Sequence, residues 1–431
     1  MKRLIALLTV LLSVSLVFAQ GTKEESIKTV TIWHSHSGSI GEAFDDIVED
    51  FNDGYGKENN IRIEAIYQGK ANDVLTKVKA NINSGDKLPE IACLDATAAL
   101  DMSTEPRVVT PEELGIDTSR LVEQALEAYR SDKLLALPFN ASALVLYYNK
   151  TLFDEKGLNA PKTIDDIIAI SPTLKAEDKD GNITRYAIQN APTTYELTSF
   201  IGTQNGYSYF VNNKNGHLGT PTEVLLKKDG TFKAFLEKWK ALYETGALNN
   251  TPSGASAEFA AGRTAMILAS SSNLKTIENA IGSSFELGLA GTPTVNSGDS
   301  CGAAVGGGAL FAYSSGEEVK AVLEYLINKE VQFYFSSSTG YIPVNLDVYQ
   351  MDEYKSYIEK NPLSAVASDI ILNSDKNIVN VWLPSAYQIY YSFQENINGA
   401  ITGKKTIDKS VDDMASVIEG ALKDYAKQNS N

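Results

Sequence analysis

The sequence predicts an α/β protein that is built from two lobes, and three observations point to this class. The chain has 431 residues, more than one ordinary hydrophobic core accommodates. Residues 29–95 alternate between strand and helix patterns, as a doubly wound sheet does. The stretch Leu137–Lys150 begins as a proline-bounded polar loop and then becomes apolar and aromatic. Such a stretch is typical of a chain that changes direction before a buried strand, and we interpret it as a hinge between two lobes.

The composition is that of a soluble globular protein and limits the possible partners. Hydrophobic residues make up 43% of the chain and charged residues 21%. The formal net charge of −16 disfavours nucleic acid as a partner, because phosphate neutralisation requires a basic face. The sequence predicts no cofactor.

The N-terminus has the pattern of an export signal. Lys2 and Arg3 precede an apolar run that is shorter than a membrane span, and Val17-Phe18-Ala19 fits the small-residue cleavage rule. We expect a signal peptide over residues 1–19, a disordered polar tail over residues 20–28, and a periplasmic or other extracytoplasmic location. A retained membrane anchor is the alternative. The two cysteines, Cys93 and Cys301, allow at most one disulfide, and whether they pair stays open.

The first third of the chain contains the clearest periodicity. Apolar residues alternate in strands or recur at helical spacing, and the segments follow one another as strand, helix, strand, helix and strand. The expected elements are a strand Thr29–Trp33, a helix Ile40–Phe51, a strand Ile61–Tyr67, a helix Val74–Ile82 and a strand Ile91–Leu94. In doubly wound sheets, ligands bind outside the carboxyl ends of the strands. Trp33, residues 69–71 and Asp95 all lie at such ends.

The remainder of the chain after the hinge contains two further features of functional interest. A serine cluster, Ser270–Ser272, follows an expected strand, where it is either a helix cap or a row of hydrogen-bond donors. Gly306–Gly308 interrupt an apolar run, which predicts a bend or a close backbone approach and marks a candidate second crossing between lobes. The other expected elements are helices at 163–170, 232–243, 319–326, 387–401 and 407–425, a strand at 265–269, and a turn at 339–343 that presents Tyr341.

Two patterns suggest other chemistry. His34 and His36 could be metal ligands, but the third histidine, His217, is distant in sequence and no familiar ligand spacing is completed, so we expect no metal site. Residues 298–302 match the G-x-S-x-G pattern around Ser300. A nucleophile elbow requires a strand before the serine and a helix after it, whereas polar loop residues precede Ser300.

Seven segments in order resemble the extracytoplasmic solute-binding proteins of ABC importers that take up carbohydrates, and within that family most of all its glycerol-3-phosphate-binding members. The matching residues are 33–41, 138–150, 265–271, 306–307, 339–343, 359–362 and 403–406. The resemblance implies the type II periplasmic-binding-protein fold, in which each lobe is a mainly parallel sheet flanked by helices and the ligand cleft lies between the lobes. The expected N-terminal lobe comprises residues 29–139 and 307–339, and the expected C-terminal lobe comprises residues 140–303 and 343–431.

The resemblance also implies ligand contacts, some retained and some replaced. Family positions that contact ligand match Ser142, Ser270, Gly307, Tyr341 and, one carbon shorter than the family residue, Asp95. A family tyrosine is replaced near Ala71, and the arginine that grips phosphate has no counterpart, since Trp382 stands near its place. We therefore add Trp382 and Trp33 as candidate aromatic faces for a ligand. The ligand stays open between a carbohydrate and glycerol 3-phosphate or a glycerophosphodiester.

The resemblance implies a function without catalysis. We expect a monomeric binding protein that captures a carbohydrate or a glycerol-3-phosphate-like polyol and delivers it to the transmembrane subunits of an ABC permease. The alternative is a secreted serine hydrolase that uses Ser300 or the loop with His34 and His36. Turnover distinguishes the two, because a transport protein returns its ligand unmodified.

Overall fold

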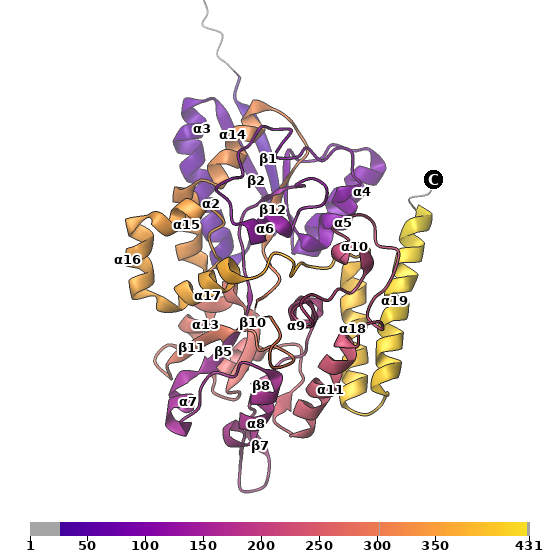
Figure 1. Cartoon of the computed structure of the whole chain (residues 1–431). Coiled ribbons are helices and arrows are strands. Elements are labelled where there is room, and N and C mark those ends of the chain that lie inside the picture. Colours follow the sequence, from indigo (N-terminus) through magenta and orange to yellow (C-terminus); the bar gives the residue numbers. More distant parts are fainter. Residues whose placement is uncertain (1–25, 301, 429–431) are drawn as a thin grey trace, which may run out of the picture.

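The computed structural model describes residues 26–300 and 302–428, which fold around two five-stranded sheets (Figure 1). The first sheet has the order β2-β1-β3-β12-β4. The second has the order β11-β5-β10-β8-β9, and β6 pairs with β7 in a separate hairpin. The strands are β1 (Lys28–His34), β2 (Ile61–Tyr67), β3 (Ile91–Asp95), β4 (Leu137–Pro138), β5 (Leu144–Asn149), β6 (Ala176–Glu177), β7 (Ile183–Arg185), β8 (Ile188–Gln189), β9 (Leu248–Asn249), β10 (Met266–Ser270), β11 (Leu287–Gly291) and β12 (Gly308–Ala312).

The expectation of mainly parallel sheets needs correction, because both sheets are mixed. In the first sheet β1 pairs in parallel with β2 and β3, whereas β12 is antiparallel to β3 and β4. In the second sheet β5 is antiparallel to β10 and β11, whereas β8 is parallel to β9 and β10. The antiparallel pairings involve β12 and β5, the strands that the chain enters directly from the other sheet.

The hinge stretch crosses from the first sheet to the second, as the sequence predicts. β4 ends at Pro138 in the first sheet, and β5 begins at Leu144 in the second. Between them, the backbone N–H of Ser142 donates to the carbonyl of Gly306 (2.9 Å), and the N–H of Gly306 donates back (2.7 Å). Ala141 pairs in the same way with Ile342, whose N–H donates to its carbonyl (2.8 Å). Three connecting segments therefore lie side by side between the sheets.

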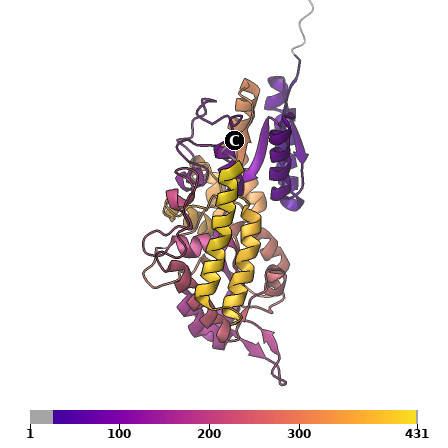
Figure 2. The ribbon, with the colours of Figure 1, turned by 90° about the vertical axis from the view of Figure 1, so that its right-hand side faces the viewer.

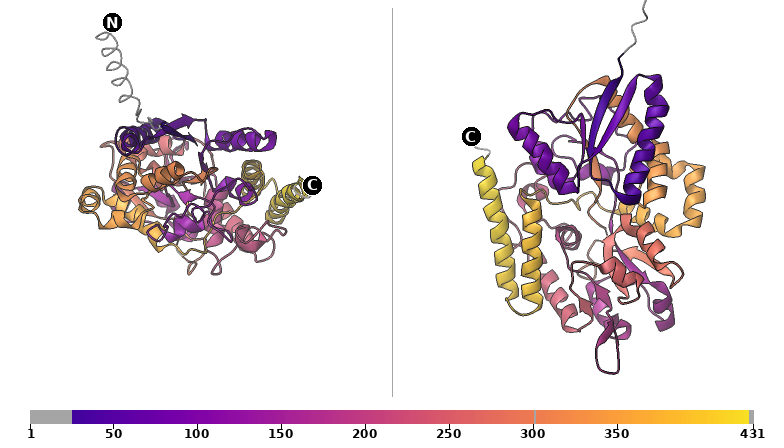
Figure 3. Two further views of the ribbon diagram at one scale, coloured as in Figure 1. Left: turned by 90° about the horizontal axis from the view of Figure 1, so that it is seen from above. Right: turned by 180° about the vertical axis from the view of Figure 1, so that it is seen from behind.

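Helices surround both sheets. The predicted helices are confirmed with small shifts at their ends, and the capping box at Thr163 forms, with Asp166 N–H donating to Thr163 Oγ1 (3.0 Å). α18 and α19 pack side by side along the edge of the molecule (Figures 2 and 3). The helices in the first half of the chain are α2 (Gly38–Asp53), α3 (Tyr55–Glu58), α4 (Ala71–Ser84), α5 (Ala99–Ser103), α6 (Glu123–Glu127), α7 (Lys150–Lys156), α8 (Ile164–Leu174), α9 (Thr194–Gly202) and α10 (Asn212–Asn215). Those in the second half are α11 (Thr231–Glu244), α12 (Ala255–Ala260), α13 (Leu274–Ile281), α14 (Glu317–Leu326), α15 (Lys329–Thr339), α16 (Asp352–Lys360), α17 (Pro362–Asn373), α18 (Ala386–Ile401) and α19 (Ile407–Gln428).

Several sequence expectations concern segments at the limits of the structure. The expected signal peptide and most of the expected tail lie outside the described residues, and so does Cys301. The expectation that the tail extends to Lys28 is wrong, because Lys28 already belongs to β1. Within the described part of the chain, no helix combines the length and apolar character needed to cross a membrane. The exact lobe boundaries stay a prediction.

Candidate functional site

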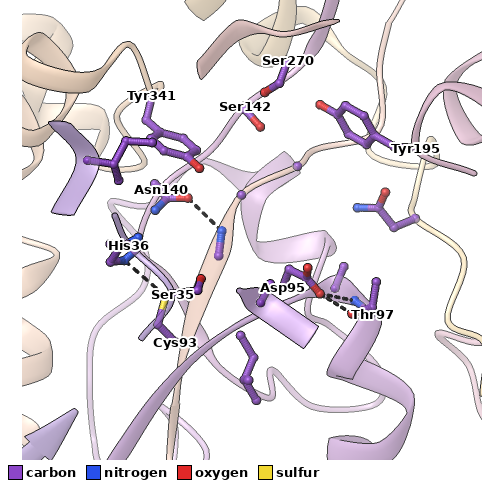
Figure 4. A pocket seen from close by; sticks show the side chains of 18 of the residues that line it. Ser35, His36, Cys93, Asp95, Thr97, Asn140, Ser142, Tyr195, Ser270 and Tyr341 are labelled. Carbon is purple, nitrogen blue, oxygen red and sulfur yellow. Dashed lines mark hydrogen bonds between the residues drawn. The ribbon is translucent and has the colours of Figure 1, made fainter. Parts of the chain in front are cut away.

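A cavity of about 410 Å³ lies where the ends of the first-sheet strands, the connecting segments and the helices α9 and α18 meet (Figure 4). Hydroxyl groups dominate its polar surface. Among the described residues that line it, Asp95 is the one carboxylate, and none is lysine or arginine. The lining residues are Ser35, His36, Ser37, Ile40, Ala71, Cys93, Leu94, Asp95, Ala96, Thr97, Asn140, Ser142, Tyr195, Thr198, Ser270, Gly306, Gly307, Gly308, Tyr341, Asn380, Val381, Tyr387 and Tyr390.

Asp95 supplies the carboxylate at the carboxyl end of β3, where the doubly wound pattern places a ligand contact. One oxygen, Oδ1, caps the short helical turn that follows, accepting from Thr97 N–H (2.9 Å) and from the Thr97 hydroxyl. The other oxygen, Oδ2, accepts from the Tyr387 hydroxyl on α18 (3.2 Å). Asp95 thus joins the first sheet to a helix of the second half across the cavity and presents an acceptor to it.

Ser142 and Ser270 lie together on the opposite wall, beside Tyr195 (Figure 4). Ser142 is held by the backbone pairing with Gly306, and the residue is 4% exposed. Ser270 ends β10, and its Oγ accepts from Ser272 N–H (3.3 Å), so the predicted cap forms. Capping and lining the cavity are compatible roles here. Burial raises the pKa of the Tyr195 hydroxyl, so that side chain is a neutral donor.

Gly307 and Tyr341 are the other two residues predicted from the sequence that line the cavity. Gly307 has φ +113°, and a Cβ there would lie 2.2 Å from the carbonyl oxygen of Asn140, so the connecting segments touch only because this residue is glycine. Tyr341 stacks on Phe335, with ring centroids 5.8 Å apart, and its carbonyl accepts from Ser336 Oγ (2.7 Å). The ring is therefore fixed in orientation before any ligand is present.

The structure places the two tryptophans of the prediction outside the cavity lining. Trp33 lies inside β1, where side chains alternate between faces, and it packs against the apolar core; the loop after the strand, Ser35–Ser37, lines the cavity instead. Trp382 is 0% exposed and stacks on His217, with ring centroids 4.0 Å apart. Its neighbours Asn380 and Val381 reach the cavity, whereas the indole faces the core behind them.

The His36–Cys93 pair also lines the cavity, and its charge state is unsuited to nucleophilic chemistry. His36 Nε2 lies 3.7 Å from Cys93 Sγ. Burial lowers the pKa of His36 to about 3 and raises the pKa of Cys93 to about 12. The imidazole is thus a weak base and the thiol stays protonated, whereas a reactive cysteine requires the thiolate.

The hydrolase alternative has no geometric support at Ser300. This residue lies in a loop after β11 and before β12, and its N–H donates to the carbonyl of Thr203 (3.1 Å). The strand–serine–helix arrangement of a nucleophile elbow is not formed there. In the described ranges, no group of three or more histidine, cysteine or acidic residues is arranged to hold a metal ion.

Sequence reasoning missed the tyrosines that enter the cavity from the helices α9 and α18. Tyr387 and Tyr390 come from the first two turns of α18, and Tyr195 from the first turn of α9. Their signal is the i, i+3 spacing of Tyr387 and Tyr390, which puts both rings on one helix face. Which face that is depends on how α18 packs against β3, and this is long-range information.

Comparison with known proteins agrees with this architecture. Residues 46–362 match the family model described as bacterial extracellular solute-binding protein. The sn-glycerol-3-phosphate-binding periplasmic protein of Yersinia pseudotuberculosis is 24% identical, with 94% of each chain covered. The protein of the same name from Escherichia coli O1:K1 is 26% identical, covering 90% of this chain and 91% of the relative.

Solved structures show the same fold. The cyclic α-maltosyl-1,6-maltose binding protein of Arthrobacter globiformis superposes with a TM-score of 0.73 at 22% identity, covering 92% of this chain and 99% of the other. UgpB of Mycobacterium tuberculosis, solved with glycerophosphocholine, gives a TM-score of 0.74 at 21% identity with the same coverage. These likenesses establish the two-lobe fold that the resemblance implies.

Proposed function

The chain belongs to the bacterial extracellular solute-binding proteins, and we propose that its cavity binds a neutral, polyhydroxylated solute, a carbohydrate or polyol, for delivery to an ABC permease. One observation carries the choice of solute: the lining combines many hydroxyls with a single carboxylate and no cationic side chain among the described residues. Serine, threonine and tyrosine hydroxyls both donate and accept, as sugar hydroxyls do.

The same lining argues against a phosphate ester as the preferred solute. A buried phosphate needs charge-assisted hydrogen bonds, which arginine and lysine supply. In this cavity it would instead meet Asp95, whose carboxylate repels it. The curated relatives are named for sn-glycerol 3-phosphate, so the two solute classes are the competing ligands to test.

A thermal-shift screen tests the proposal directly, because a ligand that binds the folded state raises its apparent stability. The panel contains maltose, other neutral mono- and oligosaccharides, glycerol, glycerol 3-phosphate and glycerophosphocholine. We expect a rise in Tm with a neutral sugar or polyol and none with glycerol 3-phosphate. A rise with the phosphoesters alone contradicts the proposal. Recovery of the bound solute unmodified after incubation supports transport over hydrolysis.

Removing two hydroxyls from the cavity is expected to weaken binding of the solute found in that screen. The double variant Ser142→Ala/Tyr341→Phe keeps the ring stacked on Phe335 and should raise Kd by about 10- to 100-fold, since each hydrogen bond contributes about 1 kcal/mol. Titration calorimetry measures the change. The matched control is Ser338→Ala/Tyr55→Phe at exposed positions outside the cavity. An unchanged Kd in the double variant removes both residues from the site.

The finer expectations about export and assembly remain proposals. Family membership supports an extracytoplasmic location and a permease partner. Cleavage after Ala19 is checked by mass spectrometry of the exported protein. The monomeric state is checked by light scattering at several concentrations.

A further inference from the structure

Residues 212–217, here called the clamp turn, have an unusual backbone. Asn213, Lys214 and Asn215 have φ values of 57°, 52° and 56°, and Gly216 follows at 92°. L-residues adopt this left-handed conformation singly, seldom in a row, and asparagine tolerates it better than lysine does. Strain of this kind persists only where surrounding contacts enforce it, and it is concentrated at functional positions.

The first set of enforcing contacts comes from the cavity wall. Asn215 Nδ2 donates to the carbonyl of Val379 (3.2 Å), and Trp382 N–H donates to the carbonyl of Asn215 (2.9 Å). Asn380 and Val381, which lie between these two anchors, line the cavity. The clamp turn therefore holds this stretch of the wall from its far side.

The second set comes from the end of α6, which precedes β4 of the first sheet. Lys214 Nζ lies 3.0 Å from Glu127 Oε2, with the two side chains 19% and 13% exposed. The other oxygen of Glu127 lies 2.8 Å from Arg130 Nε. An ion pair shielded from water to this degree is screened less by salt than a surface pair. The clamp turn, which contains the short element α10 between α9 and α11, is thereby tied to the N-terminal lobe.

His217 contacts both the segment that follows α6 and the cavity wall. The residue is 2% exposed, with Nδ1 3.0 Å from the carbonyl oxygen of Arg130 and Nε2 2.9 Å from that of Asn380. Burial lowers the pKa of His217 to about 4; Lys214 lowers it too, whereas the two carbonyls and Glu127 raise it. Both neighbours only accept, and a neutral imidazole has one N–H, so one of the two contacts is a hydrogen bond at a time.

We propose that the clamp turn is a positioning device for the solute cavity: Lys214 and His217 lock the wall at Asn380 and Val381 to the N-terminal lobe and so set solute affinity without touching the solute. This proposal rests on the proposed solute-binding function. Asn380 connects the clamp turn to the connecting segments. Its carbonyl faces His217, and its Nδ2 donates to the carbonyl of Val305 (2.5 Å), next to the Gly306 pairing. A shift of the clamp turn therefore reaches the connecting segments through one residue.

Three variants separate the contributions of charge, hydrogen bonding and packing. Lys214→Gly removes the ion pair while suiting the left-handed backbone, so it protects the fold. His217→Phe keeps a ring against Trp382 but has no donor. His217→Gln restores N–H donors and is the conservative rescue. The matched control is Lys228→Ala, which breaks an exposed ion pair with Glu223 in the same part of the chain.

The measurements are small-angle scattering of the protein without added solute, Tm, and Kd with dissociation rate for the solute from the screen. Lys214→Gly and His217→Phe should increase the radius of gyration and raise Kd about tenfold through faster dissociation, a coupling of ordinary size between distant sites. Their Tm should stay within about 3 °C of the parent value. His217→Gln should recover most of the affinity, and Lys228→Ala should match the parent.

The outcomes distinguish the two proposals. A radius of gyration unchanged in both Lys214→Gly and His217→Phe overturns the clamp, whatever the solute screen returns. A parent protein that binds no member of the panel contradicts the proposed function, and the scattering comparison still decides the clamp. A large loss of Tm in Lys214→Gly with no change in scattering assigns the clamp turn a purely structural role and also overturns the proposal.

Discussion

Gly307→Ala should destabilise the protein by about 3 kcal/mol or more and abolish solute binding. Two costs add: an L-residue at φ +113° is strained, and the new Cβ would lie 2.2 Å from the backbone oxygen of Asn140. Backbone cannot rotate away as a flexible side chain can, so the connecting segments must separate. The hydrogen bond from the Tyr129 hydroxyl to the Gly307 carbonyl (3.1 Å) is then disturbed as well. Urea unfolding followed by circular dichroism measures the loss.

Gly298→Ala is the matched control for backbone strain. Gly298 also has positive φ, at 91°, but a Cβ there meets nothing within 4 Å. Its cost should be limited to about 1–2 kcal/mol of conformational strain, and the difference between the two variants isolates the contact with Asn140. Equal losses in the two variants would mean that the close approach of the connecting segments contributes nothing to stability.

The local elements could be predicted from sequence because their signals are local. Ile61–Tyr67 is a strand with the predicted bounds, and the capping box at Thr163 opens α8 as its residue types require. The direction of β12 in the first sheet could not be predicted in this way. Its pairing with β3 joins residues more than 200 positions apart, and the glycines that mark the crossing do not specify which neighbour the strand will find.

The candidate site also has residues that could be predicted from the sequence and residues that could not. Asp95, Ser142, Ser270, Gly307 and Tyr341 line one cavity, and each stands at the end of a strand or in a connecting segment, where topology brings residues together. Trp382 has suitable chemistry and the matching place in the resemblance, but its ring faces the core. Whether an aromatic ring in an irregular segment turns inward depends on what packs behind it, here His217.

Acidification should reduce stability through histidines that are buried in the neutral state. Burial lowers the pKa of His36 to about 3 and that of His217 to about 4, whereas an unfolded chain protonates histidine near pH 6.5. Because the unfolded state binds protons first, their stabilisation is complete above about pH 6.5 and declines as pH falls towards the folded pKa values. Each histidine should cost roughly 2–3 kcal/mol of unfolding free energy between pH 7 and pH 4.5.

The variant His217→Gln isolates one of these contributions, since carboxylates with lowered pKa, such as Glu90 and Glu113, also weaken the fold as they are protonated. Urea unfolding of both proteins at pH 7 and pH 4.5 should show that the variant loses roughly 2–3 kcal/mol less than the parent over this interval. Identical losses would mean that His217 contributes nothing to the pH dependence. A variant that loses more stability than the parent would mean that His217 is already protonated at neutral pH, donating to the carbonyls of Arg130 and Asn380 at once. The link between the N-terminal lobe and the cavity wall would then be an imidazolium stacked on Trp382, and its stability would have the opposite pH dependence, fading as pH rises.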